Sequence, residues 1–193
     1  MGRPLEFDPR EALDKALELF WRHGYEGTSL TDLTKAMGIV RPSLYATFGS
    51  KEDLFRQVVD LYWSRHMGFA RAAREKPTAR EVVEALLFGF ADAVTGCGTP
   101  AGCLGVNGAL ACSPASEDIQ KELAARRTRD EAALRKRLER ARSEGDLPQD
   151  VSPADLARFI TTVLRGMAVQ AKSGASRQEL RRVVATALRV WPG

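Results

Sequence analysis

The stretch GIVRPSLYATFGSKEDLF, residues 38–55, decides how the first part of this 193-residue chain folds. Leu44 and Phe48 are four positions apart, so they lie on the same face of a helix. The other residues of RPSLYATF are mostly small or polar, and Tyr45 is the one aromatic side chain among them. The sequence therefore predicts a short helix over residues 41–48 with one apolar face and one slim, hydrogen-bonding face.

Helical patterns also occupy the residues on both sides of this segment. Residues 8–24 (DPREALDKALELFWRHG) repeat apolar side chains every three or four positions and end at a glycine. In residues 28–38 (TSLTDLTKAMG), Ser29 is an expected N-cap and Asp32 its capping-box partner. Three short helices with tight turns match a helix-turn-helix, whose last helix enters a DNA major groove.

The rest of the chain also predicts helices, and no segment alternates as a half-buried strand does. Residues 50–75 read as one helix about 35 Å long at 1.5 Å per residue. A break with a proline follows at residues 76–78. Further helices are expected over residues 79–94, around 104–112, and over 116–144, 152–174 and 176–193. The predicted fold class is all-α.

Composition fits an ordinary globular protein, with 44% hydrophobic and 28% charged residues. No run approaches the roughly 18 apolar residues of a membrane span, and the start lacks the apolar core of a signal peptide, so a cytoplasmic protein is expected. The net charge is +4, yet residues 1–75 hold eleven basic and eleven acidic residues. Charge alone therefore does not locate a DNA-binding surface.

The cysteines do not form a metal or disulfide pattern. Cys97, Cys103 and Cys112 are an odd number, six and nine positions apart, so free thiols and no metal site are expected. No cofactor is expected, and neither GxSxG nor HExxH occurs, so the chain is not expected to be an enzyme. Two alternatives stay open: a redox or electrophile sensor that uses Cys103 or Cys112, and a helical enzyme with a dispersed site.

Residues 12–55 resemble the DNA-binding domain of the TetR family of bacterial transcriptional repressors. The matching residues are Ala16, Phe20, Gly24, Tyr25, Thr28, Ser29, Asp32, Leu33, Ala36, Met37, Gly38, Ile39, Leu44, Tyr45, Phe48, Lys51, Glu52, Asp53 and Leu54. The resemblance implies a DNA-binding domain over residues 1–50, a connecting helix over about 51–75, and a ligand-binding and dimerisation domain over 78–193. It implies a sequence-specific, ligand-responsive repressor.

The resemblance also implies which residues contact double-stranded operator DNA. They are Thr28, Ser29, Arg41, Pro42, Ser43, Tyr45, Ala46, Thr47 and Lys51. Thr28, Lys51 and the Tyr45 hydroxyl would bind phosphates, whereas Ala46 and Thr47 would lie near base edges. Arg41 would read guanine or bind phosphate, and Arg3 is a candidate for a minor-groove arm. Pro42 departs from the sequence of many family members, so their base preference does not transfer.

The last two predicted helices carry apolar stripes that suit a homodimer. Candidate interface residues are Phe159, Val163, Met167, Leu180, Val183, Val184, Leu188 and Trp191. A small-molecule effector is expected among the C-terminal helices, where it would tilt the connecting helix and spoil the spacing of about 34 Å between recognition helices. Candidate pocket residues are Leu87, Phe88, Phe90, Ala91, Cys103, Val106, Asn107, Leu110, Met167 and Gln170. No membrane partner is expected.

Overall fold

The computed structural model of the chain describes residues 7–96, 98–110 and 112–192, so Arg3 and Cys97 lie outside the described residues. Within those ranges the chain forms helices and no strands, and the all-α prediction is confirmed. The elements are α1 (Pro9–His23), α2 (Leu30–Met37), α3 (Arg41–Phe48), α4 (Lys51–His66), α5 (Phe69–Arg74), α6 (Ala79–Val94), α7 (Leu104–Asn107), the 3-10 turn η1 (Pro114–Ser116), α8 (Glu117–Ser143), α9 (Pro153–Lys172) and α10 (Arg177–Arg189).

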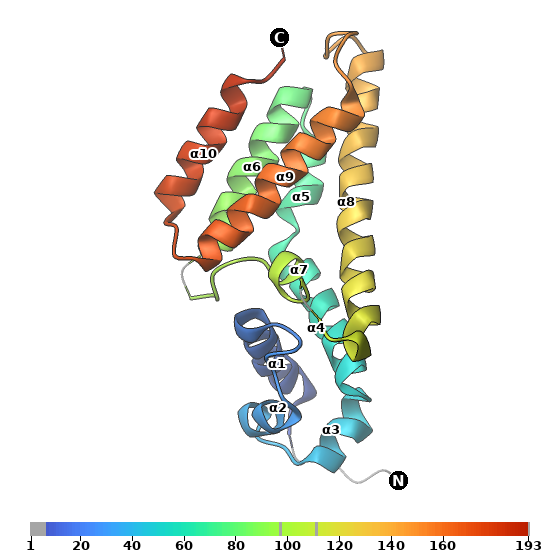
Figure 1. The fold of residues 1–193 in the computed structure, drawn as a ribbon, viewed down its shortest axis with the longest axis vertical. Helices are drawn as coiled ribbons and strands as arrows, with labels where there is room; N and C mark the ends of the chain where they lie inside the picture. Colours follow the sequence, from blue (N-terminus) through green and yellow to red (C-terminus); the bar gives the residue numbers. More distant parts are fainter. Residues whose placement is uncertain (1–6, 97, 111, 193) are drawn as a thin grey trace.

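Two bundles lie at opposite ends of an elongated molecule (Figure 1). Helices α1 to α3 form the small N-terminal bundle, and α6, α8, α9 and α10 form the larger one. Helix α4 runs from the first bundle toward the second and ends near α7. The predicted domain boundaries stay a prediction, because the buried residues of both bundles belong to one continuous apolar cluster.

Capping residues set the starts of α2 and α4 at the positions that the sequence predicts. The Ser29 side chain accepts from the Asp32 amide, and the Asp32 carboxylate accepts from the Ser29 amide, which forms the expected capping box of α2. Ser50 and Asp53 form the same motif at the start of α4. Each box satisfies amides that a helix start leaves without an intrahelical partner.

The long connecting helix predicted over residues 50–75 is wrong as a single element. Helix α4 ends at His66, and α5 begins at Phe69 after a break at Gly68. Glycine is costly inside a helix because it loses the most backbone freedom. The break lets α5 cross α6 closely: a Cβ on Gly89 would lie 2.6 Å from the Phe69 ring. The helix expected around residues 104–112 is also shorter, because α7 ends at Asn107.

Aromatic side chains join α1 to α4. The Phe20 and Phe55 rings meet edge to face at 5.0 Å between centroids, and Trp21 meets Tyr62 at 4.8 Å. The Trp21 indole also donates a hydrogen bond of 3.0 Å to the carbonyl of Gly102, just before α7. The N-terminal bundle is therefore held against the loop that leads into α7.

Candidate nucleic-acid interface and internal cavity

Helix α3 has the two faces that the sequence predicts. Leu44 and Phe48 are buried, whereas Arg41, Pro42 and Ala46 are exposed. Tyr45 is 49% exposed although it is an aromatic residue. The helix lies at the far end of the N-terminal bundle, away from α6, α9 and α10 (Figure 1). A slim helix with a polar outer face, anchored by two apolar side chains, has the shape that a DNA major groove accepts.

The remaining predicted DNA contacts of α3 are less exposed than Tyr45 or engaged in a hydrogen bond. Ser43 and Thr47 are half-buried at the edges of the outer face. The Arg41 guanidinium donates to the Thr31 hydroxyl at 2.9 Å, so it lies across the junction of α2 and α3. A guanidinium has five donors, and this bond uses one of them. Arg41 therefore keeps donors for a phosphate or a base edge.

Thr28 does not lie on this surface, which corrects the expected phosphate contact of its side chain. The residue is 1% exposed, and its hydroxyl donates to the Gly24 carbonyl at 2.7 Å. The bond closes the turn between α1 and α2 and leaves the hydroxyl without access to a ligand. Ser29 is exposed, but its hydroxyl is held in the α2 capping box.

Thr28→Val tests this structural role of the buried hydroxyl. The substitution keeps the shape and removes the donor to Gly24, so we expect the free energy of unfolding to fall by about 1–2 kcal/mol. Operator affinity should change by less than about twofold, a shift below 0.5 kcal/mol. Urea unfolding and a DNA titration measure the two quantities. The control is Thr128→Val on α8, an exposed threonine whose hydroxyl also donates to the carbonyl four residues back. A large loss of DNA affinity at unchanged stability would restore the phosphate contact.

Lys51 lies at the start of α4 with its ammonium 4.2 Å above the Tyr25 ring. Partial burial lowers the pKa of Lys51, although Glu26 and Glu52 oppose that effect. Burial and the hydrogen bond to Glu52 raise the pKa of Tyr25, whose hydroxyl donates to that carboxylate at 2.7 Å. The phosphate contact of Lys51 stays a prediction.

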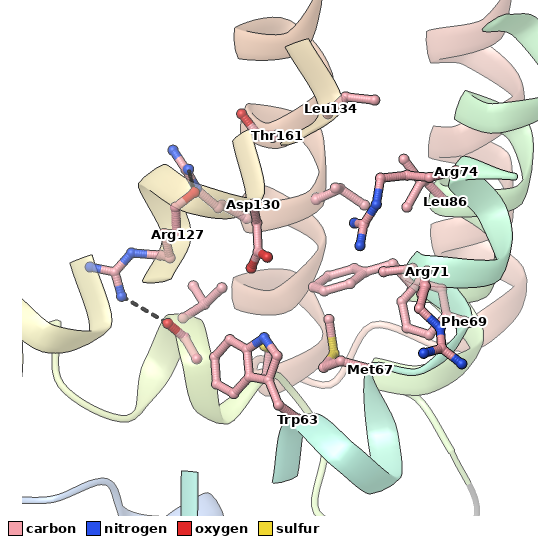
Figure 2. Close-up of a pocket in the computed structure, with 17 residues that line it drawn as sticks. Trp63, Met67, Phe69, Arg71, Arg74, Leu86, Arg127, Asp130, Leu134 and Thr161 are labelled. Atoms are coloured by element: carbon pink, nitrogen blue, oxygen red, sulfur yellow. Dashed lines mark hydrogen bonds between the residues drawn. The ribbon is translucent and has the colours of Figure 1, made fainter. Parts of the chain in front are cut away.

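The C-terminal part of the chain contains a cavity of about 160 Å³. Its walls come from the end of α4 and from α5 to α9, as Figure 2 shows. The lining residues are Trp63, Met67, Phe69, Ala70, Arg71, Arg74, Leu86, Phe90, Cys103, Gly105, Val106, Arg127, Asp130, Leu134, Thr161, Leu164 and Arg165. Most of these side chains are apolar, as in pockets that bind small molecules.

The cavity includes three of the ten predicted pocket residues, namely Phe90, Cys103 and Val106. The other seven do not line it. Leu87, Ala91 and Met167 are buried where helices pack together, and Leu110 and Gln170 are exposed. Phe88 lies under the Arg181 guanidinium, and the Asn107 side chain donates to the Ala168 carbonyl. The sequence indicates which residues of α6 are apolar, but it does not tell which side faces α5 and which faces α9 and α10.

The polar lining residues were missed because their spacing looks like a solvated helix face. Arg71 and Arg74 are three apart on α5, and Arg127 and Asp130 are three apart on α8. Burial raises the pKa of Asp130, partly against the attraction of Arg74. The sequence does show one acid and several arginines beside small residues, but only the three-dimensional fold brings residues of α5 and α8 to the same cavity.

The two described cysteines do not have the environment of reactive thiolates. Cys103 is buried, and the Tyr62 hydroxyl contacts its sulfur at 3.3 Å. Burial raises the pKa of Cys103, and it also raises the pKa of Cys112. Reactive cysteines have lowered pKa values, so this geometry does not favour the thiol-sensor alternative. Residues 7–96, 98–110 and 112–192 contain no cluster of His, Cys, Asp and Glu that suits a metal ion.

The structure divides the predicted dimer residues into two groups. Met167, Leu180, Val184 and Leu188 are buried within the chain, where α10 packs on α6 and α9, so little of their surface is left for a second copy. Phe159 and Val183 are 40% and 43% exposed, and Val163 and Trp191 are half-buried. Much of the α10 stripe closes the bundle of its own chain, and the interface with a second copy stays a prediction.

Sequence comparison connects this geometry to known proteins. A profile for "Bacterial regulatory proteins, tetR family" matches residues 12–58, and a profile for "Tetracyclin repressor-like, C-terminal domain" matches residues 79–187. The chain belongs to the TetR family. It is thus a DNA-binding transcriptional regulator, and the prediction that it is not an enzyme agrees with that family.

Several members of the TetR family resemble the chain over nearly its full length. The HTH-type transcriptional repressor ComR of Escherichia coli is 40% identical, covering 99% of this chain and 92% of ComR. The HTH-type transcriptional repressor BdcR of the same organism is 30% identical over 96% of the chain and 90% of BdcR. A structure of the regulator CifR, a C99T-C181R cysteine mutant complexed with 26-bp double-strand operator DNA, is 44% identical, with a TM-score of 0.94 and coverage of 98% and 100%.

No helix among the described residues of this TetR-family chain is long and apolar enough to cross a membrane.

Proposed function

We propose that the chain is a homodimeric, cytoplasmic repressor that binds a palindromic operator through α3 and is released from it by a small molecule. The observation that carries the proposal is the exposed outer face of α3, with Tyr45 at its centre, on a fold that matches an operator-bound relative at a TM-score of 0.94. The names of ComR and BdcR as repressors support the direction of the regulation.

The proposed dimer uses the outer side of α9 and α10. Phe159, Val169, Val183 and Val190 are large apolar residues that this side leaves exposed. A Cβ added to Gly166, on the same helix as Phe159, would meet no atom within 4 Å, so the surface there is open. A second copy of the same surface, related by a two-fold axis, would bury these residues and present two copies of α3 to successive grooves.

The cavity is connected to the DNA-binding bundle through α4. Trp63 and Met67 line the cavity near the end of this helix, while only two residues separate its first residue from the end of α3. Gly105 of α7 packs so closely on Trp63 that a Cβ there would lie 2.2 Å from the indole. A ligand between α7 and α5 therefore competes for the position of Trp63, and it releases DNA if it binds the displaced state more tightly.

Helix α8 holds the other side of α4 in place. The Arg56 guanidinium binds the Glu122 carboxylate at 2.7 Å, and Arg126 pairs with Asp60 one turn further along both helices. Arg126 also lies over the Trp63 ring at 5.4 Å. These contacts tie the orientation of α4 to α8, which itself forms one wall of the cavity.

Tyr45→Ala tests the proposed role of α3. The side chain has few contacts in the free protein, so the variant should unfold at the same denaturant concentration as the parent. Operator affinity should fall by about tenfold or more, as expected when a charge-assisted contact to phosphate is lost. Fluorescence anisotropy with DNA from upstream of the chain's own gene measures the loss.

Glu144→Ala, at the far end of α8, is the matched control for Tyr45→Ala and should bind DNA as the parent does. The proposal fails if Tyr45→Ala binds the same DNA with unchanged affinity and selectivity.

A further inference from the structure

We propose that the cavity binds a small anion with a flat apolar body, of the aromatic carboxylate class, and that Arg74 is the residue that binds its carboxylate. The inference rests on the proposed function, because it names the class of molecule that the regulatory cavity accepts. Its three supports are the size of the cavity, the balance of charge on its walls and the direction of the Arg74 side chain.

The size of the cavity selects a ligand of about one ring. Its volume is about 160 Å³, and an engineered apolar cavity of about 150 Å³ is known to hold benzene. Trp63, Phe69 and Phe90 supply aromatic walls, with Leu134 and Leu164 beside them. Such walls favour a flat apolar group by contact and by exclusion of water.

The charge on the walls selects an anion. Four of the lining side chains are arginines and one is an acid, Asp130. Arg165 is already paired with Glu131 at 3.1 Å. Arg127 donates to the Gly105 carbonyl at 2.8 Å and has no carboxylate partner in the part of the chain that the structure describes. Burial lowers the pKa of Arg127, and the like charge of Arg165 adds to that effect.

Arg74 is the cation that faces the ligand space directly. Figure 2 shows its guanidinium pointing into the cavity from α5, opposite the Asp130 carboxylate on α8. No ion pair joins these two groups within 4.0 Å among the described residues, so a space separates them. The backbone of Arg74 is fixed, because its carbonyl accepts a hydrogen bond of 3.2 Å from the buried Arg137 side chain.

A carboxylate in this space would match the paired donors of the Arg74 guanidinium. The ring of the same ligand would then lie between Trp63 and Phe90.

The charge of Asp130 allows an anionic ligand to be distinguished from a cationic one. A charged carboxylate at this position repels an anion and attracts a cation. Desolvation at the cavity wall raises the pKa of Asp130, and the nearby Arg74 opposes that effect. Removing the charge with Asp130→Asn should therefore tighten the binding of an anion and weaken that of a cation.

The experiment titrates the full-length protein with benzoate, benzyl alcohol and benzylamine by isothermal calorimetry. We expect benzoate to bind about tenfold or more tightly than benzyl alcohol, since a charge-assisted pair is gained. Arg74→Gln should weaken benzoate by a similar factor and leave benzyl alcohol within about twofold. Asp130→Asn should tighten benzoate several-fold, and Arg135→Gln, on an exposed turn of α8, should change nothing.

Tighter binding of benzylamine than of benzoate, or unchanged benzoate affinity in Arg74→Gln, overturns the proposal. Circular dichroism of each variant identifies misfolding, and Asp130→Asn decides the sign of the charge even if Arg74→Gln does not fold. The titration contains no DNA, so its result is independent of the proposed repressor function. Operator binding by the unliganded protein is measured separately, and its absence would overturn that function while leaving the ligand class standing.

Discussion

The double substitution Phe159→Asp, Val183→Asp is expected to convert the dimer to a monomer and to weaken operator binding by about a hundredfold or more. Both side chains are exposed on the outer side of α9 and α10, so the charges cost little in the free chain. In the proposed dimer each charge would be buried opposite its own copy, which is strongly unfavourable. A monomer has one copy of α3 and loses the effective concentration that links the two half-sites.

Analytical ultracentrifugation and DNA titration measure the two effects on the same sample. The control is Ala132→Asp, which places one charge on the exposed side of α8, on the opposite side of the bundle from α10 (Figure 1). This control should remain dimeric with unchanged DNA affinity. A double variant that sedimented as a dimer and bound operator normally would show that the interface lies elsewhere.

Arg137→Ala is expected to lower the free energy of unfolding by about 3 kcal/mol or more. The Arg137 side chain is only 6% exposed, and it donates to the carbonyls of Arg74, Lys76 and Pro77 at 3.2, 2.8 and 2.8 Å. These three acceptors form the connection between α5 and α6, where no helix satisfies them. Removal of the guanidinium leaves the acceptors without their donor and opens a cavity beneath α8.

Urea unfolding followed by circular dichroism tests this expectation, with Arg135→Ala as the exposed control on the same helix. The control should lie within about 0.5 kcal/mol of the parent. Equal stability of Arg137→Ala and the parent would show that the connection from α5 to α6 does not depend on this side chain.

The N-terminal bundle was predictable because its signals are local. Ser29 with Asp32 fixes the start of α2, and Leu44 with Phe48 fixes the buried face of α3. These signals lie within a few residues of the structure that they produce. Thr28 was the exception: its hydroxyl donates to the carbonyl four residues back, in a turn that also bonds to Gly108 through the Tyr25 amide.

The cavity was only partly predictable because it depends on how distant helices cross. Phe90 and Cys103 could be placed near a pocket from their apolar neighbours, but Arg74 and Asp130 come from opposite walls. A charged residue on an amphipathic helix usually points to solvent. Gly68 marks a weak point of the predicted helix, but it does not show how far α5 turns away from α4. The break in the helix is what brings α5 over the cavity.

The dimer residues show a related ambiguity. Val183 and Val184 are adjacent on α10 and equally apolar, yet the first is 43% exposed and the second is fully buried. Periodicity identifies an apolar stripe, but it does not tell whether the stripe packs on its own chain or on a second copy. The contacts of α10 with α6 and α9 decide the question for most of the stripe.

The most direct test of the account is a titration of the purified protein with DNA from upstream of its own gene. Fluorescence anisotropy should show selective binding over a scrambled duplex, two chains per palindromic site, and an affinity that falls steeply as salt rises. The same affinity for the scrambled duplex, or binding by one chain per site, would contradict the account of a dimer that reads an operator through α3.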